Sequence, residues 1–407
     1  MYIVWLRAEP IFPLDSGNRI RSFNLLRGVA REEAVTYVGL RHDDGLVGQI
    51  SSQFASPAIT VRQLIEQRTG YRFYARLLAN LGSAYPYYMK RYASLEIRDE
   101  VRKLVQSGAC DLIVCDSLES AVNLDFDLDV PKVLYHHAVE TTLWHQRYET
   151  ASGVIRRAYF NFETKRMAAY ESMTCNRFDH IIATSENDRE SLIKEHRVTS
   201  PITPVPVGVD SGYFKPPKED MTVPRRLMFS GSLDLLSNID QLLWFVSEVY
   251  PLVRREHPDA SLEIVGPNPA VEIATLPRKD QSIRVAGWVK DIRPHLAQAD
   301  IYIVPLRVPG GNRVKLYEAM AMRRPVVSTS YGAEGLNLVP EQHLLVADTV
   351  KEFAAAVNSL LRDTGKKSRL AEAGYRLVHQ EHDWSRMVAE TLQLLRSLSR
   401  RPAHAGK

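Results

Sequence analysis

The chain has 407 residues and carries 52 basic against 48 acidic side chains, for a net charge of +4. Hydrophobic residues make up 45% and charged residues 25%, ordinary values for a globular protein that exclude a collagenous or wholly disordered chain. The length exceeds what one hydrophobic core normally fills and favours two domains. The nearly balanced charge gives no indication of a nucleic-acid-binding protein.

The three cysteines, Cys110, Cys115 and Cys175, lack metal-type spacing to nearby histidines, and an odd number argues against a disulfide framework. The apolar run from Tyr2 to Leu6 is too short for a signal peptide or a membrane span, and no other stretch approaches a spanning length. We therefore expect a cytoplasmic protein, with peripheral attachment to the inner face of the membrane left open.

In the first half, short apolar runs alternate with longer helical stretches, which is typical of parallel sheets built from strand-helix-strand units. The predicted strands are Tyr2 to Leu6, Val35 to Leu40, Leu112 to Cys115, Val133 to His136 and His180 to Thr184.

A proline-rich break follows between Ser200 and Thr222, where five prolines remove backbone donors and disfavour helix. We take it as the linker between an acceptor-side domain of residues 1–203 and a donor-binding domain of residues 204–383. The final segment, residues 384–407, contains a long helix from Trp384 to Leu398, which we expect to cross back toward the first domain.

After the linker the alternation restarts. The predicted strands are Leu227 to Ser230, Leu262 to Val265, Ile283 to Ala286, Ile301 to Val304, Val326 to Ser328 and Leu344 to Val346. Helical periodicity occupies Ile239 to Arg255, Arg293 to Ala299 and Val314 to Met322. The pattern predicts an α/β protein of two doubly wound, Rossmann-like parallel-sheet domains facing a central cleft, with the ligand at the carboxyl ends of the strands.

The most informative segment runs from Ile301 to Thr329. Its loop carries Gly310 and Gly311, whose backbone N–H groups can approach an anion at the start of the next helix. Arg313 and Lys315 fall in the first turn, where cations oppose the helix dipole unless an anion is bound. This combination favours a diphosphate site, although a helix start with solvated charges explains the same residues, because short glycine signals recur by accident.

The segment from Gly310 to Thr329, followed by Gly332 to Gly335, resembles the donor-binding signature of retaining glycosyltransferases of the GT-B fold. That family, the glycosyl transferases group 1, includes sucrose synthase-like and bacterial polysaccharide mannosyl- and glucosyltransferases. Further segments resemble it in the family's order: Val205 to Pro216, Arg226 to Asp234, Ser261 to Gly266 and Gly287 to Asp291. The resemblance covers most of residues 180–380.

The resemblance implies roles for individual residues. Donor and phosphate binding falls to Gly17, Gly231, Gly310, Gly311, Asn312, Arg313 and Lys315, and the nucleotide base faces Gly287, Trp288 and Val289. His137, which aligns better than His136, and Glu318 take the catalytic positions. A neutral imidazole can hydrogen-bond a sugar hydroxyl, and the Glu318 carboxylate can accept bonds from ribose or sugar hydroxyls. One histidine of the pair can instead cap a helix or lie in the core.

The sequence departs from the family pattern at three positions. Gly310 replaces the first of two glutamates, and Ser232 and Asn238 stand near the family's usual arginine and lysine. Because a diphosphate in a partly desolvated site still needs compensating charge, we expect Arg313 and Lys315 to supply it.

The resemblance implies a metal-independent hexosyltransferase with no cofactor, which moves a sugar with retention of configuration from a nucleotide-sugar to a glycan or lipid-linked acceptor. The alternate carboxylates from Asp125 to Asp129 suit a solvated turn better than a metal site. Two alternatives remain: a GT-B nucleotide-sugar epimerase, for which no clear carboxylate pair is present, and a non-catalytic nucleotide- or glycan-binding protein. A dinucleotide oxidoreductase is disfavoured, since no G-x-G-x-x-G follows the first strand.

Aromatic and basic residues interleave in three stretches of the first half: Tyr71 to Arg76, Tyr85 to Tyr92, and Ile155 to Phe160 with Lys165 and Arg166. Three interpretations stay open: a lipid headgroup boundary, an acceptor groove, or packed helices with cations reaching to solvent.

Overall fold

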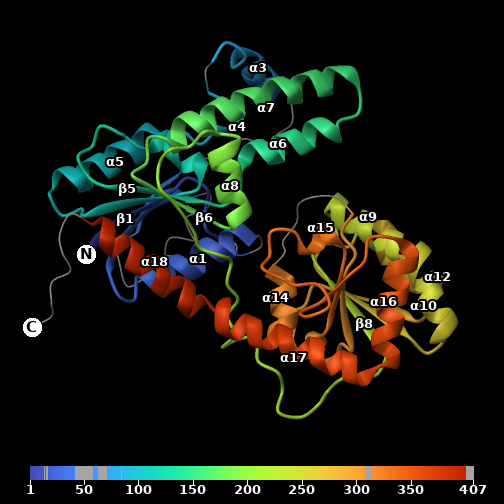
Figure 1. The fold of residues 1–407 in the computed structure, drawn as a ribbon. Helices are drawn as coiled ribbons and strands as arrows, with labels where there is room; N and C mark the ends of the chain where they lie inside the picture. Colours follow the sequence, from blue (N-terminus) through green and yellow to red (C-terminus); the bar gives the residue numbers. More distant parts are fainter. Residues whose placement is uncertain are drawn as a thin grey trace, which may run out of the picture. The chain divides into compact units, whose positions relative to one another are not determined.

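The computed structural model describes residues 1–12, 14, 17–41, 58–62, 71–83, 85–307 and 314–399. The chain forms two compact units: Met1–Val207 together with the segment from Ser385 onward, and Gly208–Trp384 (Figure 1).

The described residues of the first unit form a seven-stranded parallel sheet in the order β3-β2-β1-β4-β5-β6-β7. Its strands are β1 Tyr2–Arg7, β2 Ala34–Arg41, β3 Ala58–Arg62, β4 Leu112–Asp116, β5 Lys132–His136, β6 His180–Ala183 and β7 Ile202–Pro204. The helices are α1 Gly17–Val29, α3 Tyr71–Ala79, α4 Tyr87–Lys90, α5 Leu95–Gln106, the 3-10 helix η1 Leu118–Asn123, α6 Glu140–Glu149, α7 Val154–Cys175, α8 Glu186–Lys194 and α18 Trp384–Leu398.

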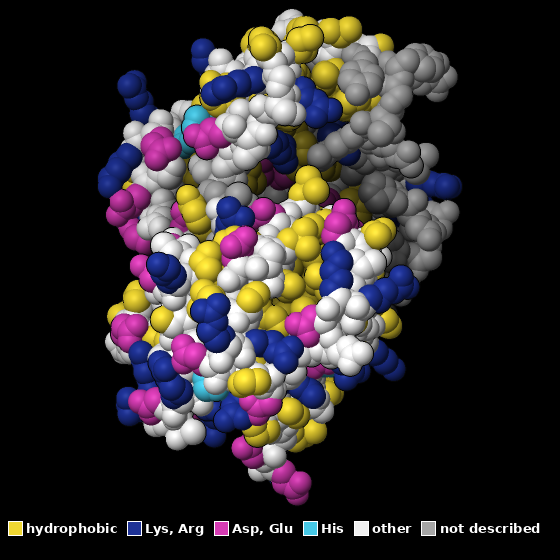
Figure 2. Space-filling model, turned by 90° about the vertical axis from the view of Figure 1, so that its right-hand side faces the viewer, with side chains coloured by type: hydrophobic (Ala, Val, Ile, Leu, Met, Phe, Trp, Pro, Cys, Tyr) yellow, Lys and Arg dark blue, Asp and Glu magenta, His cyan; other side chains and the backbone are white. Residues whose placement is uncertain are grey.

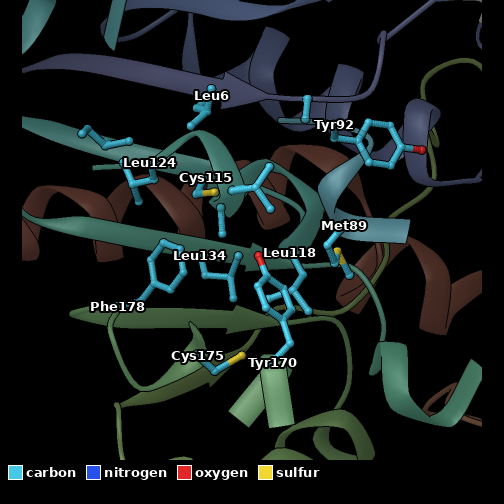
Figure 3. Packing of buried hydrophobic residues seen from close by; sticks show 14 of the residues in the cluster. Leu6, Met89, Tyr92, Cys115, Leu118, Leu124, Leu134, Tyr170, Cys175 and Phe178 are labelled. Atoms are coloured by element: carbon cyan, nitrogen blue, oxygen red, sulfur yellow. The ribbon is translucent and has the colours of Figure 1, made fainter. Parts of the chain in front are cut away.

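The central strands of this sheet are covered on both faces. Every residue of β4 and β5 is buried, as expected for parallel strands between two helical layers. Figure 3 shows part of the resulting core, where Leu6, Cys115 and Leu134 from three neighbouring strands lie with Tyr170 of α7 and Phe178. The polar residues at the ends of these strands are therefore held by well-packed elements.

Helix α18 packs against α1, although it follows the second unit in sequence. A side chain on Gly28 of α1 would come within 2.2 Å of Cγ2 of Val388, so the two helices approach closely. Near the other end, Arg396 Nε donates to Glu33 at 2.7 Å and Nη2 to Glu32 at 3.1 Å. The final helix is thus part of the first unit's packing.

The described residues of the second unit form a six-stranded parallel sheet in the order β10-β9-β8-β11-β12-β13. Its strands are β8 Arg226–Ser230, β9 Ser261–Val265, β10 Ile283–Gly287, β11 Ile301–Val304, β12 Val326–Ser328 and β13 Leu345–Val346. The helices are α9 Leu236–Trp244, the π-helix η2 Phe245–Val249, α10 Tyr250–Glu256, α11 Val271–Ala274, α12 Leu276–Lys279, α13 Arg293–Gln298, α14 Val314–Ala321, α15 Ser330–Ala333, α16 Val350–Arg362 and α17 Thr364–Glu381. Two parallel α/β sheets, as the sequence predicts, are confirmed.

Three details differ from the sequence-based expectations. Strand β3 was not predicted, and β7 lies inside the expected linker, where prolines are tolerated because β7 is an edge strand. The helix expected from Ile239 to Arg255 is interrupted by η2 just before Pro251, whose missing N–H cannot continue the regular ladder. In the described part of the chain, no helix is both long and apolar enough to cross a bilayer.

Candidate functional site

In the second unit, the start of α14 lies over the carboxyl end of β8. Lys315, on the first turn of α14, is half-buried, and its Nζ donates to the backbone oxygen of Ser230 at 3.1 Å. The same ammonium lies 4.6 Å from the centre of the Phe229 ring. Both of these contacts are with neutral groups, so neither compensates the positive charge of Lys315.

Lys315 and Glu318 influence each other's charge from successive turns of α14. Burial lowers the pKa of Lys315 to about 8, against the opposing effect of Glu318. Burial also raises the pKa of Glu318 to about 7, and Lys315 acts against that rise. Both groups therefore change charge near neutral pH, which is typical of residues in binding or catalytic sites.

The loops after β8 and β9 approach so closely that they require glycine. A Cβ on Gly266 would lie only 1.7 Å from the backbone oxygen of Gly231. Asn238 supports the first loop, since its Nδ2 donates to the Ser232 oxygen at 2.7 Å. Asn238 is buried in this role and is uncharged, whereas Lys315 brings a positive charge to the same strand end.

The predicted base loop adjoins these glycines. Gly287 ends β10 with a φ of 69°, and its oxygen accepts the N–H of Gly266 at 2.8 Å. Trp288 is 70% exposed, a large fraction for an indole, while Val289 packs partly against the core. The structure thus brings Gly231, Gly287 and Lys315 to the same edge of one sheet, the edge where parallel α/β sheets bind ligands.

Four residues predicted to bind the donor, Gly310, Gly311, Asn312 and Arg313, lie outside the described residues. Their roles stay predictions.

In the first unit, polar side chains meet at the carboxyl ends of β1, β4 and β5. Asp116 ends β4, and its Oδ1 lies 2.6 Å from His137 Nε2. The same carboxylate accepts from Ser22 at 2.9 Å, Arg7 at 3.0 Å and the Trp5 indole at 2.9 Å. Parallel strands place their carboxyl ends at one edge, which explains how residues more than 100 positions apart converge.

This network fixes the charge and tautomer of His137. Burial lowers the pKa of His137 to about 4, even though Asp116 favours the charged form, so the imidazole is neutral at physiological pH. Burial alone would raise the pKa of Asp116, but Arg7 and His137 hold it well below its usual range. Because the carboxylate can only accept, Nε2 carries the proton and Nδ1 is an acceptor, with no partner among the described residues.

His136 has a different role from its neighbour. Its Nε2 lies 3.0 Å from Glu171, and hydrogen bonds with Cys175 and Glu171 overcome the effect of burial and raise its pKa well above the ordinary value. Glu171 in turn accepts the backbone N–H groups of Glu140 and Thr141 at 2.8 and 3.0 Å, which closes the first turn of α6. His136, the last residue of β5, thus has a structural role: it pairs with the carboxylate that binds the start of α6.

Gly17 begins α1, and the arginines that follow it have partners within the unit. Arg19 donates to Glu9 at 3.4 Å, and Arg21 donates to the backbone oxygen of His137 at 3.1 Å. The sequence carries no motif that points to Arg7, Ser22 or Asp116. Asp116, which directly follows the predicted strand Leu112 to Cys115, could have been found by its place at a strand end. Asp125, in the carboxylate-rich turn, pairs with Arg102 at 2.9 Å.

Both halves of the chain match glycosyltransferase family models. Residues 59–213 match Glycosyltransferase Family 4, and residues 224–363 match Glycosyl transferases group 1.

Among curated relatives, an uncharacterised 44.6 kDa protein of the Klebsiella pneumoniae cps region is 22% identical over 393 residues, 94% of this chain and 96% of its own. The lipopolysaccharide core biosynthesis glycosyltransferase LpsE of Rhizobium meliloti is 33% identical over 118 residues, 28% of this chain and 34% of LpsE. A GDP-mannose-dependent phosphatidylinositol monomannoside mannosyltransferase of Mycolicibacterium smegmatis is 24% identical over 241 residues, covering 54% and 63%.

Solved structures share the fold over nearly the whole chain. HepE of Anabaena, crystallised with UDP, has a TM-score of 0.69 at 14% identity, covering 98% of this chain and 99% of HepE. Sucrose-phosphate synthase of Thermosynechococcus elongatus has a TM-score of 0.68 at 17% identity, covering 98% of both chains. This likeness shows that the chain has the GT-B fold, and the two family matches identify residues 59–213 and 224–363 as glycosyltransferase domains.

Proposed function

We propose that the protein transfers a hexosyl residue from a nucleotide diphosphate-sugar to a glycan or lipid-linked acceptor, with retention of configuration and without a metal ion or cofactor. The observation that carries the proposal is Lys315, a half-buried cation at the start of α14 whose hydrogen bond goes to a neutral carbonyl. A diphosphate bound there compensates the charge of Lys315 and accepts from the start of the helix.

In the proposed reaction, the bond between the anomeric carbon and the diphosphate oxygen breaks. The acceptor hydroxyl attacks the oxocarbenium-like centre from the face that the diphosphate leaves, and its proton passes to the departing diphosphate oxygen. Lys315 stabilises the charge that develops on the departing diphosphate, which is where electrostatic catalysis acts most strongly. Glu318, whose pKa of about 7 leaves it partly ionised at neutral pH, accepts hydrogen bonds from ribose or sugar hydroxyls. Neutral His137 likewise accepts a hydrogen bond from a hydroxyl of the transferred sugar, through its Nδ1.

The names of the relatives suggest which donors to test first. HepE has been crystallised with UDP-glucose, and the mycobacterial relative is GDP-mannose-dependent. A thermal-shift panel of UDP-, GDP- and ADP-sugars should single out one nucleotide class, because a ligand that binds only the folded protein raises its melting temperature.

Calorimetry with that nucleotide then tests the site. Lys315→Met should weaken binding by roughly 10- to 100-fold, the value of one charge-assisted hydrogen bond, and Arg313→Met should weaken it as well. Lys351→Met, at an exposed lysine of α16, is the matched control. Unchanged affinity in both site variants would refute the proposed anion site.

Turnover separates this proposal from its alternatives. Slow release of the nucleoside diphosphate from the purified protein, accelerated by acceptor, supports transfer. Tight binding with no release would identify a non-catalytic binding protein, and a change in the sugar's configuration with the donor intact would identify an epimerase.

A further inference from the structure

Helices α6 and α7 form a hairpin (Figure 1). The side chains at the end of this hairpin are exposed and apolar. Val154 and Ile155, the first two residues of α7, are 85% and 87% exposed. Figure 2 looks onto the side of the molecule where the hairpin ends, and its upper part shows hydrophobic and basic side chains gathered together. Single exposed apolar residues are common, but two adjacent ones of this exposure at the end of a hairpin form a contact surface.

Basic residues follow these apolar ones directly. Arg156 and Arg157 are exposed in the first turn of α7, which contains no acidic residue and whose N-cap, Gly153, offers no side chain. Cations at this position oppose the helix dipole, and a bound anion removes that penalty. Lys165 is exposed further along the same helix. Glu149, at the end of α6, is an exposed acidic residue, and its Oε1 lies 3.2 Å from Nε2 of His145.

The end of α3 lies against α7 further along that helix and carries exposed apolar residues. Arg166 of α7 donates to the backbone oxygen of Asn80 at 3.0 Å and stacks 5.1 Å from the Phe162 ring, so the residues after α3 lie against this part of α7. Leu78, Leu81 and Phe162 are all exposed. The sequence from Tyr71 to Tyr92 contains four basic residues and no Asp or Glu. We call the exposed end of the hairpin the tip patch, formed by Val154, Ile155, Arg156 and Arg157.

The structure separates the tip patch from the packed part of the same aromatic and basic stretches. Arg166 is largely buried and pairs with Glu163, and the rings of Tyr85 and Tyr170 pack edge to face at 5.7 Å. Those residues hold the helices together. The exposed ones combine aliphatic side chains with arginines, a composition that suits the boundary between lipid headgroups and acyl chains.

We propose that the tip patch docks this protein onto an anionic lipid bilayer, with Val154 and Ile155 entering the headgroup boundary and Arg156 and Arg157 meeting lipid phosphates. Basic residues near a membrane surface each add attraction to anionic lipids, and apolar side chains add binding through the area they bury. The tip patch lies in the first unit and uses none of the donor-binding residues, so the proposal stands independently of sugar transfer.

The test is cosedimentation of the full chain with vesicles of phosphatidylcholine, with and without phosphatidylglycerol. The protein should bind the anionic vesicles, and binding should weaken as salt is added. The double variants Val154→Ser/Ile155→Ser and Arg156→Glu/Arg157→Glu should each reduce binding by about tenfold or more. Because these side chains are exposed, the melting temperature and nucleotide affinity should stay unchanged.

Matched controls lie elsewhere on the same unit. Leu95, 76% exposed at the start of α5, and Arg31, exposed after α1, provide Leu95→Ser and Arg31→Glu. No binding to anionic vesicles, or an equal loss in the controls and the tip-patch variants, would overturn the proposal. So would a concentration-dependent dimer in sedimentation velocity that the Val154→Ser/Ile155→Ser variant abolishes while vesicle binding persists, since the patch would then belong to a second copy.

Discussion

Nε2 of His137 lies 2.6 Å from Oδ1 of Asp116, and the same oxygen accepts from Nη1 of Arg7 at 3.0 Å. Asp116 and Arg7 are almost completely buried. The carboxylate therefore does two things at once: it neutralises a buried guanidinium and orients the imidazole of a predicted catalytic residue.

Replacing this carboxylate should be costly. Asp116→Asn keeps the shape of the side chain but leaves Arg7 with no compensating charge from β4, and we expect a loss of about 3 kcal/mol or more in the free energy of unfolding. Urea denaturation measures it. Asp125→Asn breaks the more exposed pair with Arg102 and should cost less than about 1 kcal/mol. Equal effects of the two variants would contradict a structural role for the Asp116 network.

The buried His137 should make stability depend on pH. Its pKa of about 4 in the folded protein is below the value of about 6.5 for a free imidazole, so the unfolded chain binds the proton more readily. The stabilisation is therefore fully present above pH ~6.5 and is lost as pH falls toward 4. Asp116 acts in the same direction at lower pH, whereas His136, with its raised pKa, acts in the opposite direction.

Urea titrations of the wild type and His137→Gln across this pH range isolate the effect. The wild type should lose on the order of 3 kcal/mol more than the variant between pH ~6.5 and 4. His145→Gln, at an exposed histidine of α6, should follow the wild type. Parallel curves for the wild type and His137→Gln would show that His137 is solvated rather than locked.

Nucleotide affinity should fall as pH rises above 8. Lys315 loses its proton near this pH, and a neutral amine no longer compensates a diphosphate. Lys315→Arg stays charged and should keep its affinity up to at least one pH unit higher. Calorimetric titrations with UDP or GDP between pH 7 and pH ~9.5 measure both.

The variant Glu318→Gln provides a second test of the pH dependence of nucleotide affinity. The carboxylate of Glu318 raises the pKa of Lys315, so its removal should move the loss of affinity to lower pH. A profile that does not move in Lys315→Arg or in Glu318→Gln would show that another group controls the pH dependence.

The contact between the loops after β8 and β9 should tolerate no side chain. Gly266→Ala would place a methyl group 1.7 Å from the Gly231 oxygen, so the loops must separate. We expect a loss of about 2 kcal/mol or more in stability, together with weaker nucleotide binding. Gly82→Ala is the control, since no atom of the described residues, apart from its chain neighbours, lies within 4 Å of the added carbon. Thermal denaturation of both variants decides it, and similar melting temperatures would contradict the close approach.

The central strands could be predicted from sequence because burial on both faces makes them continuous apolar runs. The ends of β1, β4 and β5 lie within one residue of their predicted positions. The edge strand β7 could not be predicted, because it contains Pro204. A proline is excluded only from central strands, and the sequence does not say where in the sheet a strand lies. The π-helix before Pro251 depends on how α9 and α10 pack, which periodicity does not report.

The candidate site was predictable only where one short segment carries it. Lys315 and Glu318 lie together on α14 because they are three residues apart on a helix. The partner of His137 is on another strand, and Asp116 becomes its neighbour through the register that pairs Asp116 with Tyr135. The order of the strands in the sheet brings such distant residues together, and a sequence motif does not reveal that order.

The chain enters and leaves the second unit at the same place. Val209 N–H donates to the His382 oxygen at 2.7 Å, and Trp384 N–H donates to the Val209 oxygen at 3.2 Å. The segment that enters the unit and the segment that leaves it are therefore hydrogen-bonded to each other. A gene fragment encoding residues 208–384 would begin and end at adjacent points and suits excision or circular permutation. A stop codon after Trp384 would instead harm the opposite half of the protein, because it removes the helix that packs on Gly28 and the arginine that pairs with Glu32 and Glu33.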